Sequence, residues 1–322
     1  MTFFDVISSL LLLLAEFAFV LGISPLLVGI LRKVRARSQR REGATVWQPY
    51  RDLRKLFSKG TVYAESSSAV TPYAPWISLA ALLGAVPFIP WFFLPGPLGF
   101  AGDLIVVVGL LALSRFMTAL AALDAGSTFG GMGSSRDMWI GALAEPTFLL
   151  VIFAWGAPAG STQASTIALY GLTLGVYQLS PATILATVAF VLLLLTETGR
   201  LPVDNPATHL ELTMIHEAMV LEYGGRDLAL VELGKGVRFV LLTGLLLAVA
   251  LPWGMALELS VLALLVGIAL LLAKLLAATW AVGQLETRVA KWRLFRLTDL
   301  ATLAVTLAFG SLALTYLVGV GS

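Results

Sequence analysis

The sequence contains no cysteine among its 322 residues, and only 12% of its residues are charged. Without cysteine the chain can form no disulfide and supplies no thiolate for a nucleophile, a zinc site or an iron–sulfur cluster. Soluble domains carry about 25% charged residues. A chain with half that share, and a mean hydropathy of +0.91, has too little polar surface to stay folded in water. The net charge of +2 gives no reason to expect a nucleic-acid partner.

Long apolar stretches take up most of the chain. A helix needs about 20 apolar residues to cross the hydrocarbon core, which predicts an all-α polytopic membrane protein that forms a single domain over residues 1–322. The stretch Ser165–Val176 is too short to cross and is assigned to an outer connection. The eight expected spans are Ile7–Leu31, Tyr73–Leu94, Gly102–Leu123, Trp139–Ala157, Leu179–Glu197, Gly236–Trp253, Glu258–Val282 and Asp299–Gly319.

Positive charge is confined to the loops on one side. Arg32–Pro72 holds ten Lys and Arg residues, whereas Pro95–Ala101, Pro158–Gln178 and Gly254–Leu257 hold none. Positively charged loops face the cytoplasm, so both termini are expected outside. The loops 32–72 and 198–235 are then cytoplasmic and are expected to form a docking face.

The two long cytoplasmic loops differ in character. In the first, Leu53, Leu56 and Phe57 recur at helical spacing, which predicts an amphipathic helix on the membrane surface or against a partner. The second is rich in acids and holds both histidines, His209 and His216. Together with Glu211 or Glu217 the histidines could bind a metal, but their spacing matches no standard zinc motif, so no metal site is predicted.

Five ionisable residues inside expected spans are singled out as candidates, because a charge there costs several kcal/mol unless it is paired or hydrated. They are Glu16, Arg115, Glu145, Glu197 and Lys274. One interpretation is structural: Arg115 pairs with Glu145 or Glu197 and locks the bundle, while Lys274 snorkels or pairs with Glu16. The other is functional, because buried carboxylates near the acidic loop could carry protons into the membrane.

Three segments resemble the complex I subunit 1 family. They are Gln48–Leu56, the run Gly133-Ser-Ser-Arg136 followed by Ala144-Glu145, and Glu-Thr-Gly-Arg-Leu-Pro-Val-Asp at 197–204. The third is the specific match, similar to the family's Glu-Thr-Asn-Arg-x-Pro-Phe-Asp. Within the family, Asp204–Tyr223 is similar to the hydrogenase branch. The quinone-reducing branch usually carries carboxylates where this chain has Ala207 and His209.

The resemblance implies a multi-pass subunit of a prokaryotic inner membrane, without a catalytic residue, cofactor or metal of its own. Such a subunit belongs to an energy-converting nickel–iron hydrogenase or a formate hydrogenlyase. It anchors soluble subunits that carry iron–sulfur clusters and a nickel–iron site, and it couples their electron transfer to ion movement through antiporter-like membrane neighbours. The implied proton path comprises Glu145, Glu197, Asp204, Glu211, Glu217 and Glu222, with Arg115, Arg136, Arg200, Lys274 and Glu16 as charge partners.

Two other functions stay open. A quinone-binding subunit of a complex I-like NADH dehydrogenase predicts a lipid-accessible apolar cavity near the first and second long cytoplasmic loops. An independent transporter predicts internal inverted repeats and broken helices, and no repeat is evident in the sequence.

Overall fold

The computed structural model describes residues 3–96, 102–175, 180–204, 214–290 and 297–319. No strand lies in these ranges, and the predicted all-α fold is confirmed. The elements are α1 (Phe3–Ser38), α2 (Gln48–Phe57), α3 (Val70–Ala85), η1 (Val86–Phe88), α4 (Leu104–Asp124), α5 (Thr128–Ala159), α6 (Ala164–Leu174), α7 (Pro181–Glu197), η4 (Glu217–Val220), α8 (Gly225–Ala250), α9 (Val261–Arg288) and α10 (Leu297–Gly319).

Each expected span coincides with a helix of the described chain. Seven of these helices are long and apolar enough to cross a membrane. The remaining expected span is α7, a helix of 17 residues. The stretch assigned to an outer connection is α6, which has only 11 residues. At 1.5 Å per residue α6 is about 16 Å long, well short of the hydrocarbon core of about 30 Å.

Two helices begin eleven residues earlier than their apolar stretches. α5 begins at Thr128 rather than Trp139, and α8 begins at Gly225 rather than Gly236. Hydropathy could not locate these starts, because the first turns of both helices carry polar residues that find partners inside the protein. The first part of α5 also packs closely against the chain at Ile215. A Cβ at Gly133 would lie 2.9 Å from the carbonyl oxygen of Ile215.

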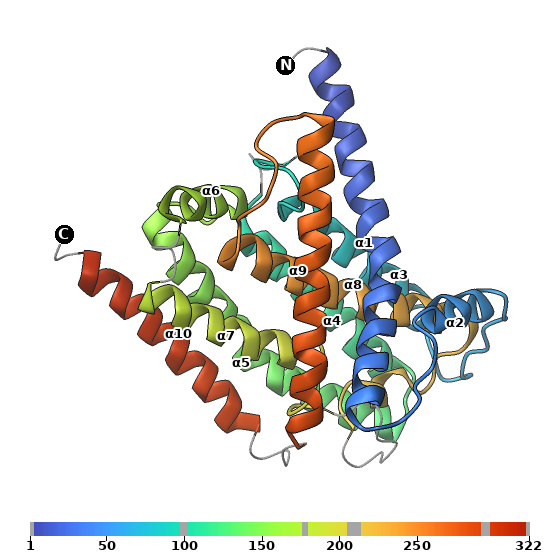
Figure 1. The fold of residues 1–322 in the computed structure, drawn as a ribbon. Helices are drawn as coiled ribbons and strands as arrows, with labels where there is room; N and C mark the ends of the chain where they lie inside the picture. Colours follow the sequence, from blue (N-terminus) through green and yellow to red (C-terminus); the bar gives the residue numbers. More distant parts are fainter. Residues whose placement is uncertain (1–2, 97–101, 176–179, 205–213, 291–296, 320–322) are drawn as a thin grey trace.

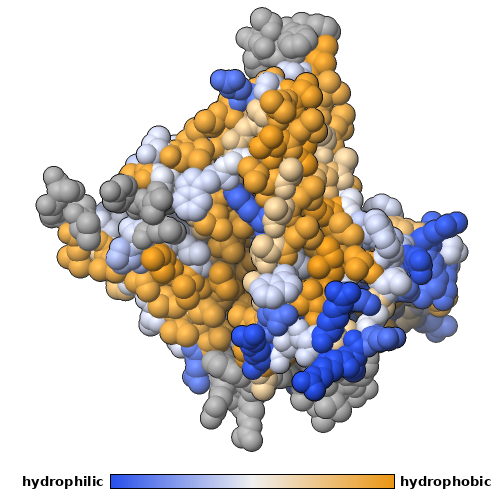
Figure 2. All heavy atoms as spheres, viewed as in Figure 1, coloured by the Kyte–Doolittle hydropathy of each residue, from blue (hydrophilic) through white to orange (hydrophobic). Residues whose placement is uncertain are grey.

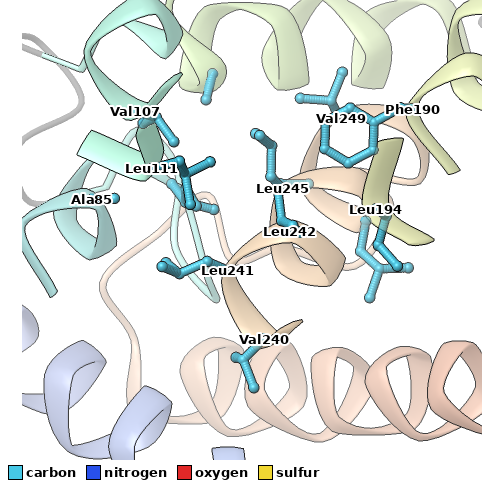
Figure 3. Close-up of a cluster of buried hydrophobic side chains, with 14 of the residues drawn as sticks. Ala85, Val107, Leu111, Phe190, Leu194, Val240, Leu241, Leu242, Leu245 and Val249 are labelled. Atoms are coloured by element: carbon cyan, nitrogen blue, oxygen red, sulfur yellow. The ribbon is translucent and has the colours of Figure 1, made fainter. Parts of the chain in front are cut away.

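Helix α8 forms the centre of the core. It packs against α1, α3, α6 and α7. In its most apolar stretch, 78% of the residues are buried. Figure 3 shows Leu241 and Leu245 of α8 between side chains of the α3–α4 pair and of α7. A helix that is apolar on all sides is stable only where protein or lipid surrounds it, and here protein does so.

Four helices begin at a polar residue that caps the first turn. The side chains of Asp103, Ser127, Ser180 and Ser260 accept hydrogen bonds from backbone N–H groups of α4, α5, α7 and α9. Such caps satisfy donors that a helix start leaves unpaired. They therefore mark the helix starts independently of hydropathy.

The polar side chains gather at one end of the molecule. In Figure 1, α1 and α9 run side by side and descend toward the connections at the bottom of the view, while α2 lies to the right. Figure 2 shows hydrophilic side chains concentrated along that lower edge and over α2, whereas the helix faces above are largely hydrophobic with isolated hydrophilic groups. This lower end is called the basic end below.

Candidate functional site

A cavity of about 180 Å³ lies within the basic end. The last turns of α1, the middle of α4, the first half of α8, residues 197–204 and η4 enclose it. Its lining includes the charged residues Arg32, Arg35, Arg115, Asp137, Glu197, Arg200, Asp204, Glu217, Glu232, Lys235 and Arg238, together with His216. These charges form four clusters around one space.

The first cluster is centred on Glu197 at the end of α7, whose side chain is buried. The Arg115 guanidinium of α4 donates to Glu197 through Nη2, and its Nη1 lies 3.5 Å from Oε1 of Glu145 on α5. Arg238 of α8 lies 3.7 Å from the other oxygen of Glu197 and donates to the Ser114 hydroxyl at 3.0 Å. One guanidinium thus joins a buried carboxylate to one that is 44% exposed.

The second cluster is centred on Glu286, near the end of α9. Its side chain is fully buried and contacts Arg200 Nη1 at 3.2 Å and Arg35 Nε at 3.3 Å. The Arg200 guanidinium also lies over the ring of Phe239, 4.4 Å from its centroid, a favourable cation–π geometry. Burial lowers the pKa of Arg200, with Glu286 opposing that shift, and a guanidinium remains charged in proteins.

The third cluster places His216 between two aspartates. Its Nε2 lies 3.3 Å from Asp137 on α5, and its Nδ1 lies 3.7 Å from Asp204. Asp204 also accepts the backbone N–H groups of Ile215 and His216 at 3.1 and 3.3 Å. Burial lowers the pKa of His216, but Asp204 and Asp137 outweigh burial, so the pKa of this imidazole is raised above its ordinary value.

The fourth cluster is a lysine held by two glutamates. The ammonium of Lys235 on α8 donates to Glu217 of η4 at 2.8 Å and to Glu232 at 2.7 Å. All three side chains are about one-third exposed. Among the side chains of the four clusters that line the cavity, these three are therefore the most exposed.

The structure gathers only part of the predicted path. Glu197, Asp204 and Glu217 line the cavity, and Glu145 reaches it through Arg115. Glu222 is exposed and outside the cavity lining, and Glu211 lies outside the described residues. Of the charge partners, Arg115 and Arg200 line the cavity.

The other three charge partners lie elsewhere. Arg136 donates to the backbone carbonyl of Met214 at 2.9 Å and so holds the chain just before His216. Lys274 donates to the carbonyl of Leu251 at 2.6 Å and to that of Trp253. The suggested Lys274–Glu16 pair is wrong, because the ammonium binds backbone carbonyls just after the end of α8. Glu16 is buried in α1, and its carboxyl oxygens have no hydrogen-bond partner within the described chain.

Sequence reasoning did not identify Asp137, Arg238 and Glu286 as site residues, and it considered His216 only as a metal ligand. Arg238 lies inside an expected span, so the criterion for intramembrane charges could have found it. Glu286 follows the end of an expected span, where a carboxylate is ordinary. Only the fold, which brings Arg35 and Arg200 to it, gives that residue its importance.

The cavity brings together groups that can gain or lose a proton. Within the described ranges no three His, Asp or Glu side chains come close enough to hold a metal ion. Five carboxylates and an imidazole line one cavity of about 180 Å³ together with cations that do not lose their protons readily. Such a set can change its proton occupancy when a nearby charge changes.

The fold and the site define a class: a multi-pass helical membrane protein with a buried network of charges at one end. Comparison with known proteins gives the family. The family model described as "NADH dehydrogenase" matches residues 10–316, and the chain belongs to this family, which is like subunit 1 of complex I.

Two relatives from Escherichia coli (strain K12) are similar over most of their length. Hydrogenase-4 component C is 36% identical over 296 residues, which cover 92% of each chain. Formate hydrogenlyase subunit 4 is 31% identical over 273 residues, or 85% of this chain and 88% of the relative. The resemblance to the hydrogenase branch is thereby confirmed.

A solved structure has the same fold. A chain in the structure of the membrane-bound sulfane sulfur reductase, an archaeal respiratory membrane complex, superposes with a TM-score of 0.82. The match covers 95% of this chain and 99% of the other, at 21% sequence identity. At that identity the similarity shows only that the two chains share a fold.

Proposed function

We propose that this chain is the membrane anchor and proton-handling subunit of an energy-converting nickel–iron hydrogenase or a formate hydrogenlyase. The family and both curated relatives support a membrane subunit of a redox complex. The observation that carries the proton-handling role is the set of four charge clusters around one cavity, to which Glu145 is joined through Arg115. In this proposal the complex lies in a prokaryotic inner membrane.

The path begins at the solvent-accessible side of the cavity. Glu217 and Glu232 exchange protons with water while Lys235 balances their charge. Protons move across the cavity, past Asp204 and His216, to Glu197. Arg115 contacts both Glu197 and Glu145. When one of these carboxylates is protonated it loses its charge, and the guanidinium then interacts mainly with the other. The two carboxylates are thereby coupled although the arginine itself passes no proton.

The docking face for the soluble arm comprises the loops 32–72 and 198–235. Subunits with iron–sulfur clusters and a nickel–iron site would bind there, and antiporter-like subunits would lie beside this chain in the membrane. Charge interactions are stronger near a membrane than in bulk water, because the effective dielectric is lower. A redox change in the arm would then alter proton occupancy in the cavity.

The test replaces the carboxylates in the intact complex. Glu197→Gln and Glu145→Gln keep the size of each side chain and remove its charge. We expect both complexes to assemble and to transfer electrons, with proton translocation into inverted membrane vesicles reduced at least ten-fold.

Glu258→Gln is the matched control, because Glu258 is an exposed carboxylate far from the cavity lining. It should translocate protons like the wild type. Normal translocation by the Glu197 and Glu145 variants would exclude this path. Equal loss in the Glu258 variant would show that the assay reports damage to the complex in general.

Quinone binding remains the second candidate function. The observation that favours it is an apolar cavity of about 260 Å³ between α1, α2 and α8, in the region where a quinone site was expected. A quinone analogue that inhibits electron transfer in the purified complex would support this candidate. Electron transfer that is insensitive to quinone analogues would favour the hydrogenase function.

A further inference from the structure

The cavity between α1, α2 and α8 lies beside the proposed proton path and shares Val28, Arg32 and Glu232 with the first cavity. Its walls are mainly apolar and include Pro25 and Val28 of α1, Leu53 and Leu56 of α2, and Leu233 of α8. Its volume of about 260 Å³ is below the range of about 300–1,000 Å³ of sites that enclose a drug-sized ligand. The cavity can therefore hold part of a long, flexible ligand, with the rest of that ligand outside it.

Helix α2 is held firmly against α1 over this cavity. The Tyr50 hydroxyl donates to the carbonyl of Gly22, well inside α1, and Pro49 is buried. The chain before α2 packs on Gly29, where a Cβ would collide with the carbonyl of Val46. These contacts place α2 beside the membrane-spanning part of α1 rather than away from it in solution.

The outer surface of α2 has the composition of a membrane-interface helix. Arg51, Arg54 and Lys55 are exposed, and the aromatic side chains of Trp47 and Phe57 are 60% and 43% exposed. Basic residues attract anionic lipid headgroups, and aromatic residues collect at the level of the headgroups. The blue side chains over α2 in Figure 2 belong to this surface.

Apart from Glu232, which is paired with Lys235, the charges that line the cavity are two cations and one carboxylate. Arg32 of α1 and Lys55 of α2 line the cavity from opposite sides, and Asp52 lies 3.9 Å from Arg32 and 3.8 Å from Lys55. One carboxylate between two exposed cations orients both without neutralising them. The exposed Arg51 and Arg54 add further positive charge along the helix.

We propose that this cavity binds an anionic phospholipid, with one acyl chain between α1, α2 and α8 and the phosphate at Arg32 and Lys55. The polar groups lie where a headgroup would, at the rim. Deeper in the cavity the Ser24 hydroxyl already donates to the carbonyl of Leu21 at 3.3 Å. Glu232 also lines the cavity, and its carboxylate is paired with Lys235. This distribution suits a lipid better than a quinone ring, whose carbonyl oxygens need donors at depth.

The test measures lipid binding to the full-length purified protein by native mass spectrometry. The probes are phosphatidylglycerol and phosphatidylcholine with identical acyl chains. We expect phosphatidylglycerol to bind at least five-fold more tightly. Lys55→Glu should weaken phosphatidylglycerol about five-fold or more, as for loss of about 1 kcal/mol per basic residue near a headgroup. Leu53→Trp should weaken both lipids by filling the cavity.

Lys59→Glu is the matched control, because Lys59 is an exposed lysine just beyond α2 that does not line the cavity. Its phosphatidylglycerol affinity should stay within two-fold of the wild type. Equal binding of the two lipids, or equal loss in the Lys59 and Lys55 variants, would overturn the proposal. So would displacement of the lipid by inorganic phosphate, which would indicate a free-anion site. Displacement by a short-chain quinone that binds the Lys55→Glu variant equally well would identify a quinone site instead.

Discussion

His216 lies between two aspartates that come from distant parts of the chain. Asp137 belongs to α5, and Asp204 follows α7. The ring of His216 is also closely packed, because Gly199 turns with φ +58° directly against it. A side chain at Gly199 would collide with the imidazole. Local geometry and charge together therefore fix one position for this histidine.

The raised pKa of His216 predicts that stability depends on pH. Its charged form is favoured in the folded protein, so its contribution is complete below the ordinary pKa of about 6.5. The contribution is lost as pH rises through the raised pKa. His216→Gln should cost about 1.5–3 kcal/mol of unfolding free energy at pH 6 and clearly less at pH 9. Unfolding in mixed micelles at both pH values measures this, and a pH-independent cost would contradict it.

At the scale of the elements, Glu286 joins three segments that are far apart in the sequence. It belongs to α9, Arg35 to the last turn of α1, and Arg200 to the segment after α7. A buried carboxylate between two cations is costly to remove, because the cations then remain in the interior without a counter-charge. Glu286 is therefore expected to fix how α1 and α9 meet at the basic end.

Glu286→Gln should lower the free energy of unfolding by about 3–5 kcal/mol. Asp52→Asn is the control, because Asp52 also contacts two cations, but at the surface, where an ion pair contributes about 0–1 kcal/mol. Both variants can be compared by denaturation in mixed micelles. If the Glu286 variant loses no more stability than the Asp52 variant, Glu286 does not hold these elements together.

The elements themselves were largely predictable, whereas the charge network was not. Spans follow from apolar length, and the amphipathic pattern at 47–57 correctly predicted α2. Helix starts were wrong where polar residues such as Asp137 and Asp227 are buried inside the fold. The partners of Glu286 and His216 lie up to 251 positions away in the chain (286 − 35), and no periodic pattern encodes such a distance. The pairing of Arg115 with Glu197 could be suggested because both fall inside spans.

At the scale of the whole molecule, the number of crossings decides where the termini lie. Eight crossings return the chain to the side from which it started, and nine would not. The described helices include two short apolar ones, α6 with 11 residues and α7 with 17. At 1.5 Å per residue α7 is about 26 Å long, close to the thickness of the hydrocarbon core of about 30 Å. Helix α6 is too short, so the count should be eight.

We therefore predict that both termini lie outside, opposite the loop 32–72 with its ten basic residues. Alkaline phosphatase fused after Ser322 should be active, because that enzyme folds only outside the cytoplasm. Green fluorescent protein inserted after Gly60 should fluoresce, because it folds in the cytoplasm. An inactive phosphatase fusion together with a fluorescent Gly60 insertion would mean an odd number of crossings, so that either α6 crosses or α7 does not. It would also place the connection between α8 and α9, which carries no Lys or Arg at 254–257, on a side that the charge distribution does not favour.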